Sequence, residues 1–204
     1  MTVWERAVAA LAARALDGGL LDSLRGESLS ALSPEDAAAR QARRTLEGRL
    51  TDGQAAALGR IETLYGENLS RCLRFGFSRG ACACFEQQFS PDAPEDPFEE
   101  HVQQDLLTLP GMAREEAYCA NRRVAAVQQE MLAAVLDKEG GEALFALCAF
   151  WDELEYGVLW RAFGLGYRAA LALIDGAGMT PHGRAAAALR RFEARFAADA
   201  SAPG

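Results

Sequence analysis

Three acidic residues on one predicted helix are the side chains best placed for metal chemistry. Asp152, Glu153 and Glu155 fall within the apolar-patterned stretch 142–174. Carboxylates on facing helices can hold Mg²⁺ and support phosphate hydrolysis, as in helical pyrophosphatases. On a helical wheel, however, Glu67 and Glu153 lie opposite the apolar stripe, which is typical of a solvated face. A magnesium-dependent phosphohydrolase is therefore the least favoured interpretation.

The histidines and cysteines form no recognisable catalytic or metal-binding motif. His101 follows two glutamates on a helix that we expect to be exposed, and His182 stands alone. The spacing of the cysteines suits neither a zinc site nor a disulfide framework. They are Cys72, Cys82, Cys84, Cys119 and Cys148. The sequence therefore predicts no cofactor, and thiols that stay reduced in the cytoplasm. It favours a protein that is not an enzyme.

The net charge of −8 comes entirely from one segment in the middle of the chain. Residues 86–116 hold nine acidic residues and one arginine, so their balance is 1 − 9 = −8. Acidic charge disfavours direct nucleic-acid binding and docking on anionic lipid. Prolines at 91, 94 and 97 disfavour helix, so residues 90–97 are predicted to be an exposed connector.

The acidic connector is interpreted either as a solvated linker or as a surface that meets a basic partner. In the second case five carboxylates would make the contact: Asp92, Glu95, Asp96, Glu99 and Glu100. The segment could then act as a decoy or inhibitor in the basic, nucleic-acid-binding groove of a host- or phage-defence protein. The C-terminal stretch is locally basic and is interpreted as a solvated face; alternatively it could dock on this segment, in the same chain or in another copy.

Helical periodicity predicts an all-α protein. Ser33 caps a helix that runs to about residue 50, and long helices are expected over 54–89, 112–136 and 142–174. A short amphipathic helix from Phe98 and a C-terminal helix from Thr180 complete the set. The third helix carries its apolar residues on one face, which we expect to be buried: Ala120, Val124, Val127, Met131 and Val135. No apolar run long enough for a membrane span and no secretion-signal pattern is present.

An internal repeat with a period of 86 residues organises these helices. Residues 46–84 and 132–170 align without gaps and share nine identities in 39 positions, where composition alone would give roughly three. The repeated unit is a helix, a tight turn and a longer helix. Two helices cannot bury their apolar faces alone, so two such hairpins are expected to pair as a four-helix bundle with a pseudo-twofold axis.

A Phe-x-x-Gly pattern recurs at the same place in both copies. Glycine inside a helix costs about 1 kcal/mol relative to alanine, and a close approach of a second helix would offset that cost. We therefore predict that the two longest helices cross at six residues: Gly76, Phe77, Gly80, Ala162, Phe163 and Gly166.

The stretch Leu73 to Ala81 resembles a family of small, uncharacterised bacterial all-helical proteins with a Phe-x-x-Gly-Phe-x-x-Gly-Ala helix. The second copy departs from this motif, since Ala162 replaces Gly76 and Tyr167 replaces Ala81. The resemblance supports a helical fold and implies no activity.

These patterns predict an all-α bundle of two repeated helical hairpins with four long core helices. The expected divisions are an N-terminal helical segment (1–32), hairpins at 33–89 and 112–175, the acidic connector with its short helix (90–111), and a C-terminal helix and tail (176–204). We expect a non-enzymatic protein-interaction or regulatory protein. Its partner would be an unidentified protein, which could be basic, or a second copy of the chain.

Overall fold

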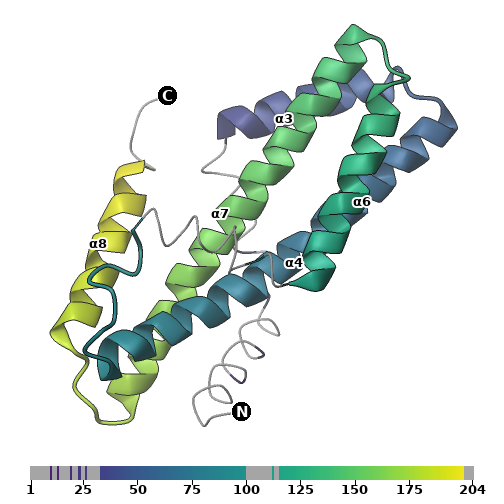
Figure 1. Ribbon diagram of the computed structural model, residues 1–204. Helices are drawn as coiled ribbons and strands as arrows, with labels where there is room; N and C mark the ends of the chain where they lie inside the picture. Colours follow the sequence, from purple (N-terminus) through teal and green to yellow (C-terminus); the bar gives the residue numbers. More distant parts are fainter. Residues whose placement is uncertain are drawn as a thin grey trace.

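The computed structural model describes residues 33–99, 112 and 115–199, together with residues 10, 13, 19, 23 and 26, and it describes no side chains for 33–35 and 195–199. All regular secondary structure in these ranges is helical, which confirms the predicted all-α fold. The helices are α3 (Ser33–Glu47), α4 (Asp52–Phe89), α6 (Glu116–Ala133), α7 (Lys138–Gly176) and α8 (Gly183–Asp199) (Figure 1). The predicted N-terminal helical segment and most of the predicted linker helix lie outside the described residues.

The two longest helices begin in the same way, 138 − 52 = 86 residues apart. Thr51 caps α4 by accepting a hydrogen bond from the backbone N–H of Gln54, whose side chain accepts one from the Thr51 N–H at 2.8 Å. Asp137 caps α7 by accepting from the Gly140 N–H at 2.8 Å. Each cap satisfies a first-turn donor that the helix itself leaves without a partner. The distance between the two helix starts equals the predicted repeat period.

Helices α4 and α7 run in the same direction and come closest at a pair of glycines (Figure 1). A Cβ atom at Gly80 would lie 1.9 Å from the carbonyl oxygen of Phe163. A Cβ atom at Gly166 would lie 1.9 Å from the carbonyl oxygen of Phe77. The two contacts are reciprocal, and both bring the backbones so close that only glycine fits.

The same contact continues one turn earlier on α4. A Cβ atom at Gly76 would lie 2.3 Å from the carbonyl oxygen of Leu159 and 3.2 Å from the Ala162 methyl group. Gly76 and Ala162 are both buried. The structure thus brings all six residues of the predicted crossing to one place between α4 and α7.

The short helices do not pack as self-contained hairpins. Helix α3 packs mainly on α7, and α6 packs mainly on α4, so each short helix lies on the long helix of the other unit. Their shared core includes Leu46 and Leu132, which are 86 residues apart. Tyr65 and Trp151, also 86 apart, meet with ring centroids separated by 4.9 Å. Helices α4 and α7 therefore pack against each other at the centre, and the short helix of each unit packs on the long helix of the other unit.

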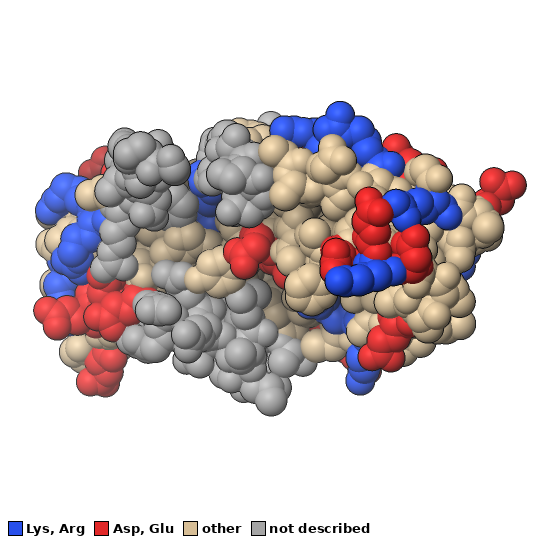
Figure 2. Space-filling view, turned by 90° about the horizontal axis from the view of Figure 1, so that it is seen from above, with Lys and Arg blue, Asp and Glu red and all other residues tan. Residues whose placement is uncertain are grey.

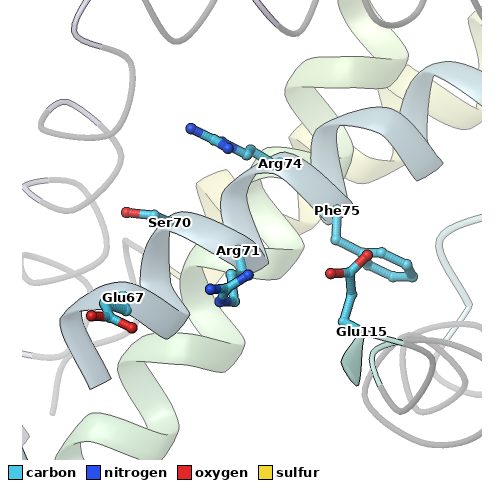
Figure 3. Close-up of a pocket in the computed structure, with 6 residues that line it drawn as sticks. All are labelled: Glu67, Ser70, Arg71, Arg74, Phe75 and Glu115. Atoms are coloured by element: carbon cyan, nitrogen blue, oxygen red, sulfur yellow. The ribbon is translucent and has the colours of Figure 1, made fainter. Parts of the chain in front are cut away.

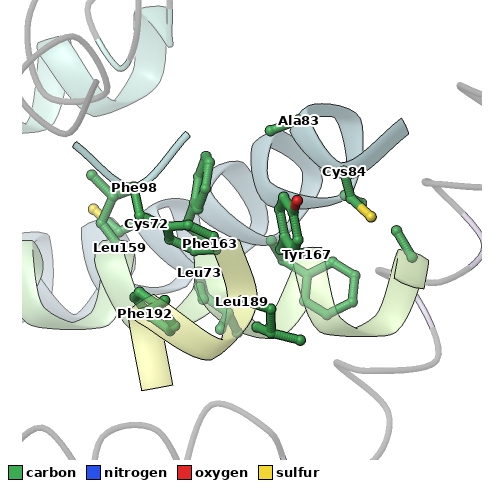
Figure 4. Packing of buried hydrophobic residues seen from close by; sticks show 14 of the residues in the cluster. Cys72, Leu73, Ala83, Cys84, Phe98, Leu159, Phe163, Tyr167, Leu189 and Phe192 are labelled. Atoms are coloured by element: carbon green, nitrogen blue, oxygen red, sulfur yellow. The ribbon is translucent and has the colours of Figure 1, made fainter. Parts of the chain in front are cut away.

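The connector and α8 close the opposite end of the bundle (Figure 4). Phe98 is fully buried there, stacked on Phe192 of α8 with ring centroids 4.3 Å apart, and it meets Phe163 edge-on at 5.4 Å. Phe98 lies in a turn, so the predicted amphipathic helix does not begin at this residue. Its ring instead anchors the connector to the core.

Gln87, near the end of α4, holds the connector with buried hydrogen bonds. It is 1% exposed, and its amide nitrogen donates to the carbonyl oxygens of Pro94 at 2.7 Å and Glu95 at 3.3 Å. Its amide oxygen accepts from the Tyr167 hydroxyl of α7 at 2.6 Å. One buried side chain therefore ties together α4, the connector and α7. None of the helices in the described ranges has both the length and the apolar character needed to cross a membrane.

Candidate functional site

The outer face of α6 carries a row of exposed apolar side chains. Val124, Val127, Met131 and Val135 are 48%, 55%, 68% and 62% exposed, and they are called the α6 stripe below. The spacing of Val124, Val127 and Met131 places them along one side of the helix, and Val135 follows in the turn after α6. The prediction that this face is buried is wrong for these four residues, because α6 packs on the bundle with Ala125 and Leu132 instead, while Ala120 is half-buried.

Polar contacts supply much of what attaches the inner face of α6. Arg122 forms an ion pair with Asp152 of α7, and its guanidinium carbon lies 5.2 Å from the ring centroid of Tyr65 on α4. The Tyr65 hydroxyl donates to Asp152 at 3.0 Å and accepts from the Gln129 amide of α6 at 3.2 Å. These directional contacts fix the rotation of α6 and therefore keep the α6 stripe facing outward.

Glu155 is the buried charge of this polar layer. Its side chain is 3% exposed, and it accepts a hydrogen bond from the Tyr118 hydroxyl at 2.9 Å. Arg122 lies 3.6 Å from the same carboxylate oxygen. Burial raises the pKa of Glu155 to about 7, although the Arg122 charge and the Tyr118 hydrogen bond both act to lower it. The expectation that this acidic group lies on a solvated face is wrong for Glu155, because its position on α7 faces α6.

A pKa near neutrality suits a general acid or base, but such a group must also reach a substrate. Glu155 contacts protein groups on α6 and lines none of the three hollows described on the surface. Among the described residues, no group of three or more His, Cys, Asp or Glu side chains could hold a metal ion. The arrangement around Glu155 is therefore suited to holding α6 in place.

Helix α3 offers an internal comparison for α6, because it occupies the matching position on the other long helix. The residues 86 positions before Val127, Met131 and Val135 are polar: Gln41, Thr45 and Arg49. Phe145 of α7, 78% exposed, similarly matches Gly59 of α4. The same architecture thus exists with a polar outer face, so packing of the bundle does not require the α6 stripe.

The groove beside each short helix also differs between the two units. Next to α3, Arg49 forms an ion pair with Asp137 at 2.5 Å and a second ion pair with Glu139. These two ion pairs bridge the groove between α3 and α7. Val135, in the turn after α6, occupies the matching place and cannot form such a bridge. A hollow of about 200 Å³, which Gly53 and Met131 help to line, lies at this place on the α6 side, whereas the hollow of about 330 Å³ on the α3 side lies further along, beside Asp36 and Arg43. The groove between α4 and α6 is open and partly apolar.

The acidic residues predicted to bind a basic partner do not form one open surface. Asp92, Glu95 and Glu99 are exposed, whereas Asp96 is only 8% exposed. Asp96 accepts from the Phe98 N–H at 2.9 Å and pairs with Arg191 of α8 at 3.3 Å. The prediction of an exposed connector is therefore wrong at Asp96. Through Arg191 the basic helix contacts the acidic segment within the chain, one of the two alternatives to a solvated face that the sequence left open. Glu100 lies outside the described residues.

A polar hollow of about 350 Å³ lies on the outer side of α4, and sequence reasoning did not identify it (Figure 3). Arg71 and Arg74 line it together with the carboxylates of Glu67 and Glu115. The two guanidinium groups extend in different directions, so they do not converge on one anion (Figure 3). Figure 2 shows acidic and basic residues together on the face seen from above. No site for one highly charged ligand emerges from these views.

Comparison with protein-family models, with curated proteins and with solved structures finds no match to this chain. Functional inference therefore depends on the chain's own geometry, in which the α6 stripe is the feature that packing explains least.

Proposed function

We propose that this chain is a non-enzymatic helical protein that acts by binding another protein through the outer face of α6. The observation that carries the proposal is the difference between α6 and α3. Both helices hold the same place in the fold, yet where α6 and the turn after it present four exposed apolar residues, the α3 unit has three polar residues and the small Ala38. An exposed apolar row beside an open groove is typical of a surface that a partner covers.

The polar layer beneath α6 supports this function. A surface that presents side chains to a partner works best when its own orientation is fixed before binding. Arg122, Tyr118 and Gln129 anchor α6 through contacts with α4 and α7, so the α6 stripe is held ready. All five cysteines are free thiols, so we expect the interaction to take place in a reducing compartment such as the cytoplasm.

Photo-crosslinking in cells that express the full chain tests the proposal. A photoreactive phenylalanine analogue replaces Val127 on α6 in one variant and Gln41, its match on α3, in the control. We expect covalent protein adducts from position 127 and few or none from position 41. Equal adduct formation at both positions, or none at either, would show that the outer face of α6 is not an interaction surface.

A further inference from the structure

We infer that the partner of the α6 stripe is a second copy of this chain, bound with its own α6 antiparallel to the first. The inference rests on the proposed function, because it names the occupant of the same surface. Three properties of α6 carry it: the sizes of the side chains along the stripe, the charges at its edge, and the length of the helix.

The side-chain sizes are self-complementary in the antiparallel orientation. When Val124 faces Val127 of the second copy, the numbers of facing residues sum to 124 + 127 = 251. The same alignment places Met131 opposite Ala120 of the second copy, since 131 + 120 = 251. Met131, the largest side chain of the stripe, thus meets the small side chain of Ala120, a half-buried residue one turn before the stripe, and pairing large with small residues is how packed helix interfaces fill space.

The charges at the edge of the stripe favour the same alignment. Arg123 and Glu130 are exposed and seven residues apart, so they lie on one side of α6, two turns from each other. In the antiparallel pair Arg123 lies near Glu130 of the second copy, and the twofold axis generates this contact twice. Within the described chain neither side chain forms an ion pair. Parallel helices in register would instead bring Arg123 toward Gln128 and Glu130 toward Val135, which are neutral.

The length of α6 sets the expected affinity. Its 18 residues span about 27 Å, so one helix pair buries less surface than a standard protein–protein interface of about 1,600 Å² in total. We therefore expect a dimer that dissociates in the micromolar range, and an oligomeric state that depends on protein concentration.

Sedimentation equilibrium across micromolar to millimolar concentrations tests the inference with a graft between the two units. The triple variant Val127→Gln, Met131→Thr, Val135→Arg gives α6 the outer face of α3. We expect its dimer dissociation constant to rise about tenfold or more. The matched control Gln41→Ala changes the outer face of α3 and should leave dimerisation unchanged. A chain that is monomeric at every concentration, or a dimer that the graft does not weaken, would overturn the inference.

Charge exchange tests the antiparallel orientation. Arg123→Glu and Glu130→Arg should each weaken the dimer about threefold to tenfold, because each sets like charges against each other twice. The double variant, or an equimolar mixture of the two single variants, should restore dimerisation. Failure of both to restore it would overturn the antiparallel pairing. If the crosslink at position 127 captures a different protein while the chain sediments as a monomer, the second-copy inference fails and the proposed function stands.

Discussion

Substituting Gly80 with alanine tests the closest approach of α4 and α7. In an ordinary helix this change stabilises a protein by up to about 1 kcal/mol. Here the new Cβ would lie 1.9 Å from the Phe163 carbonyl oxygen, and real Cβ contacts essentially never fall below 3.0 Å. The helices would have to separate by at least 3.0 − 1.9 = 1.1 Å at this point. Such overpacking typically costs about 1–3 kcal/mol.

The rigid backbone partner places the expected cost at the upper end of that range. After subtraction of the helix-propensity gain, Gly80→Ala should lower the free energy of unfolding by about 2 kcal/mol. For a chain of this size that lowers Tm by about 4–8 °C. Gly166→Ala should behave alike, because its contact with Phe77 is reciprocal. The double variant, with both glycines replaced by alanine, should lower the free energy of unfolding by less than the sum of the two single effects. One separation of the helices accommodates both methyl groups.

Gly66→Ala is the matched control on the same helix. Gly66 is exposed and a Cβ there meets nothing within 4 Å, so alanine should raise stability by up to about 1 kcal/mol. Thermal and urea unfolding followed by far-ultraviolet circular dichroism measure both variants. If Gly80→Ala stabilises the chain as Gly66→Ala does, the backbone contact between α4 and α7 does not exist.

Two buried polar groups give further predictions. The pKa of Glu155, raised by burial from 4.5 to about 7, makes the folded chain bind a proton more tightly than the unfolded chain. This contribution to stability is therefore full below about pH 4.5 and lost as the pH rises through 7, about 3 kcal/mol in all. Urea unfolding measured as a function of pH should show a smaller loss of stability between pH 4.5 and 7 in Glu155→Gln than in the unsubstituted chain. If the variant loses as much stability as the unsubstituted chain, Glu155 does not have this role. Gln87→Ala should cost about 1–3 kcal/mol and speed proteolytic cleavage of the connector at 91–97; cleavage at the original rate would show that Gln87 does not hold it.

The repeated pattern accounts for what the sequence could predict. Local signals such as the Thr51 and Asp137 caps mark the starts of the long helices, because capping depends on neighbouring residues alone. The paired glycines predicted a close helix approach, since a helix tolerates glycine where space is short. The structure places Gly80 and Gly166 in such positions. Periodicity and repetition are properties of short segments, so they could be read before the fold was known.

The features missed by sequence reasoning depend on contacts between distant segments. The apolar row of α6 was expected in the core. The face of α6 that packs on the bundle instead carries Leu132 and polar residues. The repeat contained the missing signal, because Leu132 aligns with Leu46 and both are buried. Asp96 was expected on the surface, and its burial depends on Arg191, 95 residues away. No local pattern predicts which arginine will meet which carboxylate.

Two differences between the units involve α6 and concern features that the fold does not need. Glu155 aligns with Leu69, 86 residues earlier, and both are buried, so an apolar residue fits this place in the architecture. A buried carboxylate is a costly alternative to leucine. The exposed apolar row on the outer face of α6 is a second departure that packing does not require. Glu155 of α7 holds the inner face of α6, so the two departures have a common explanation if α6 must present its outer face in a fixed orientation to a partner, a role that we do not propose for α3.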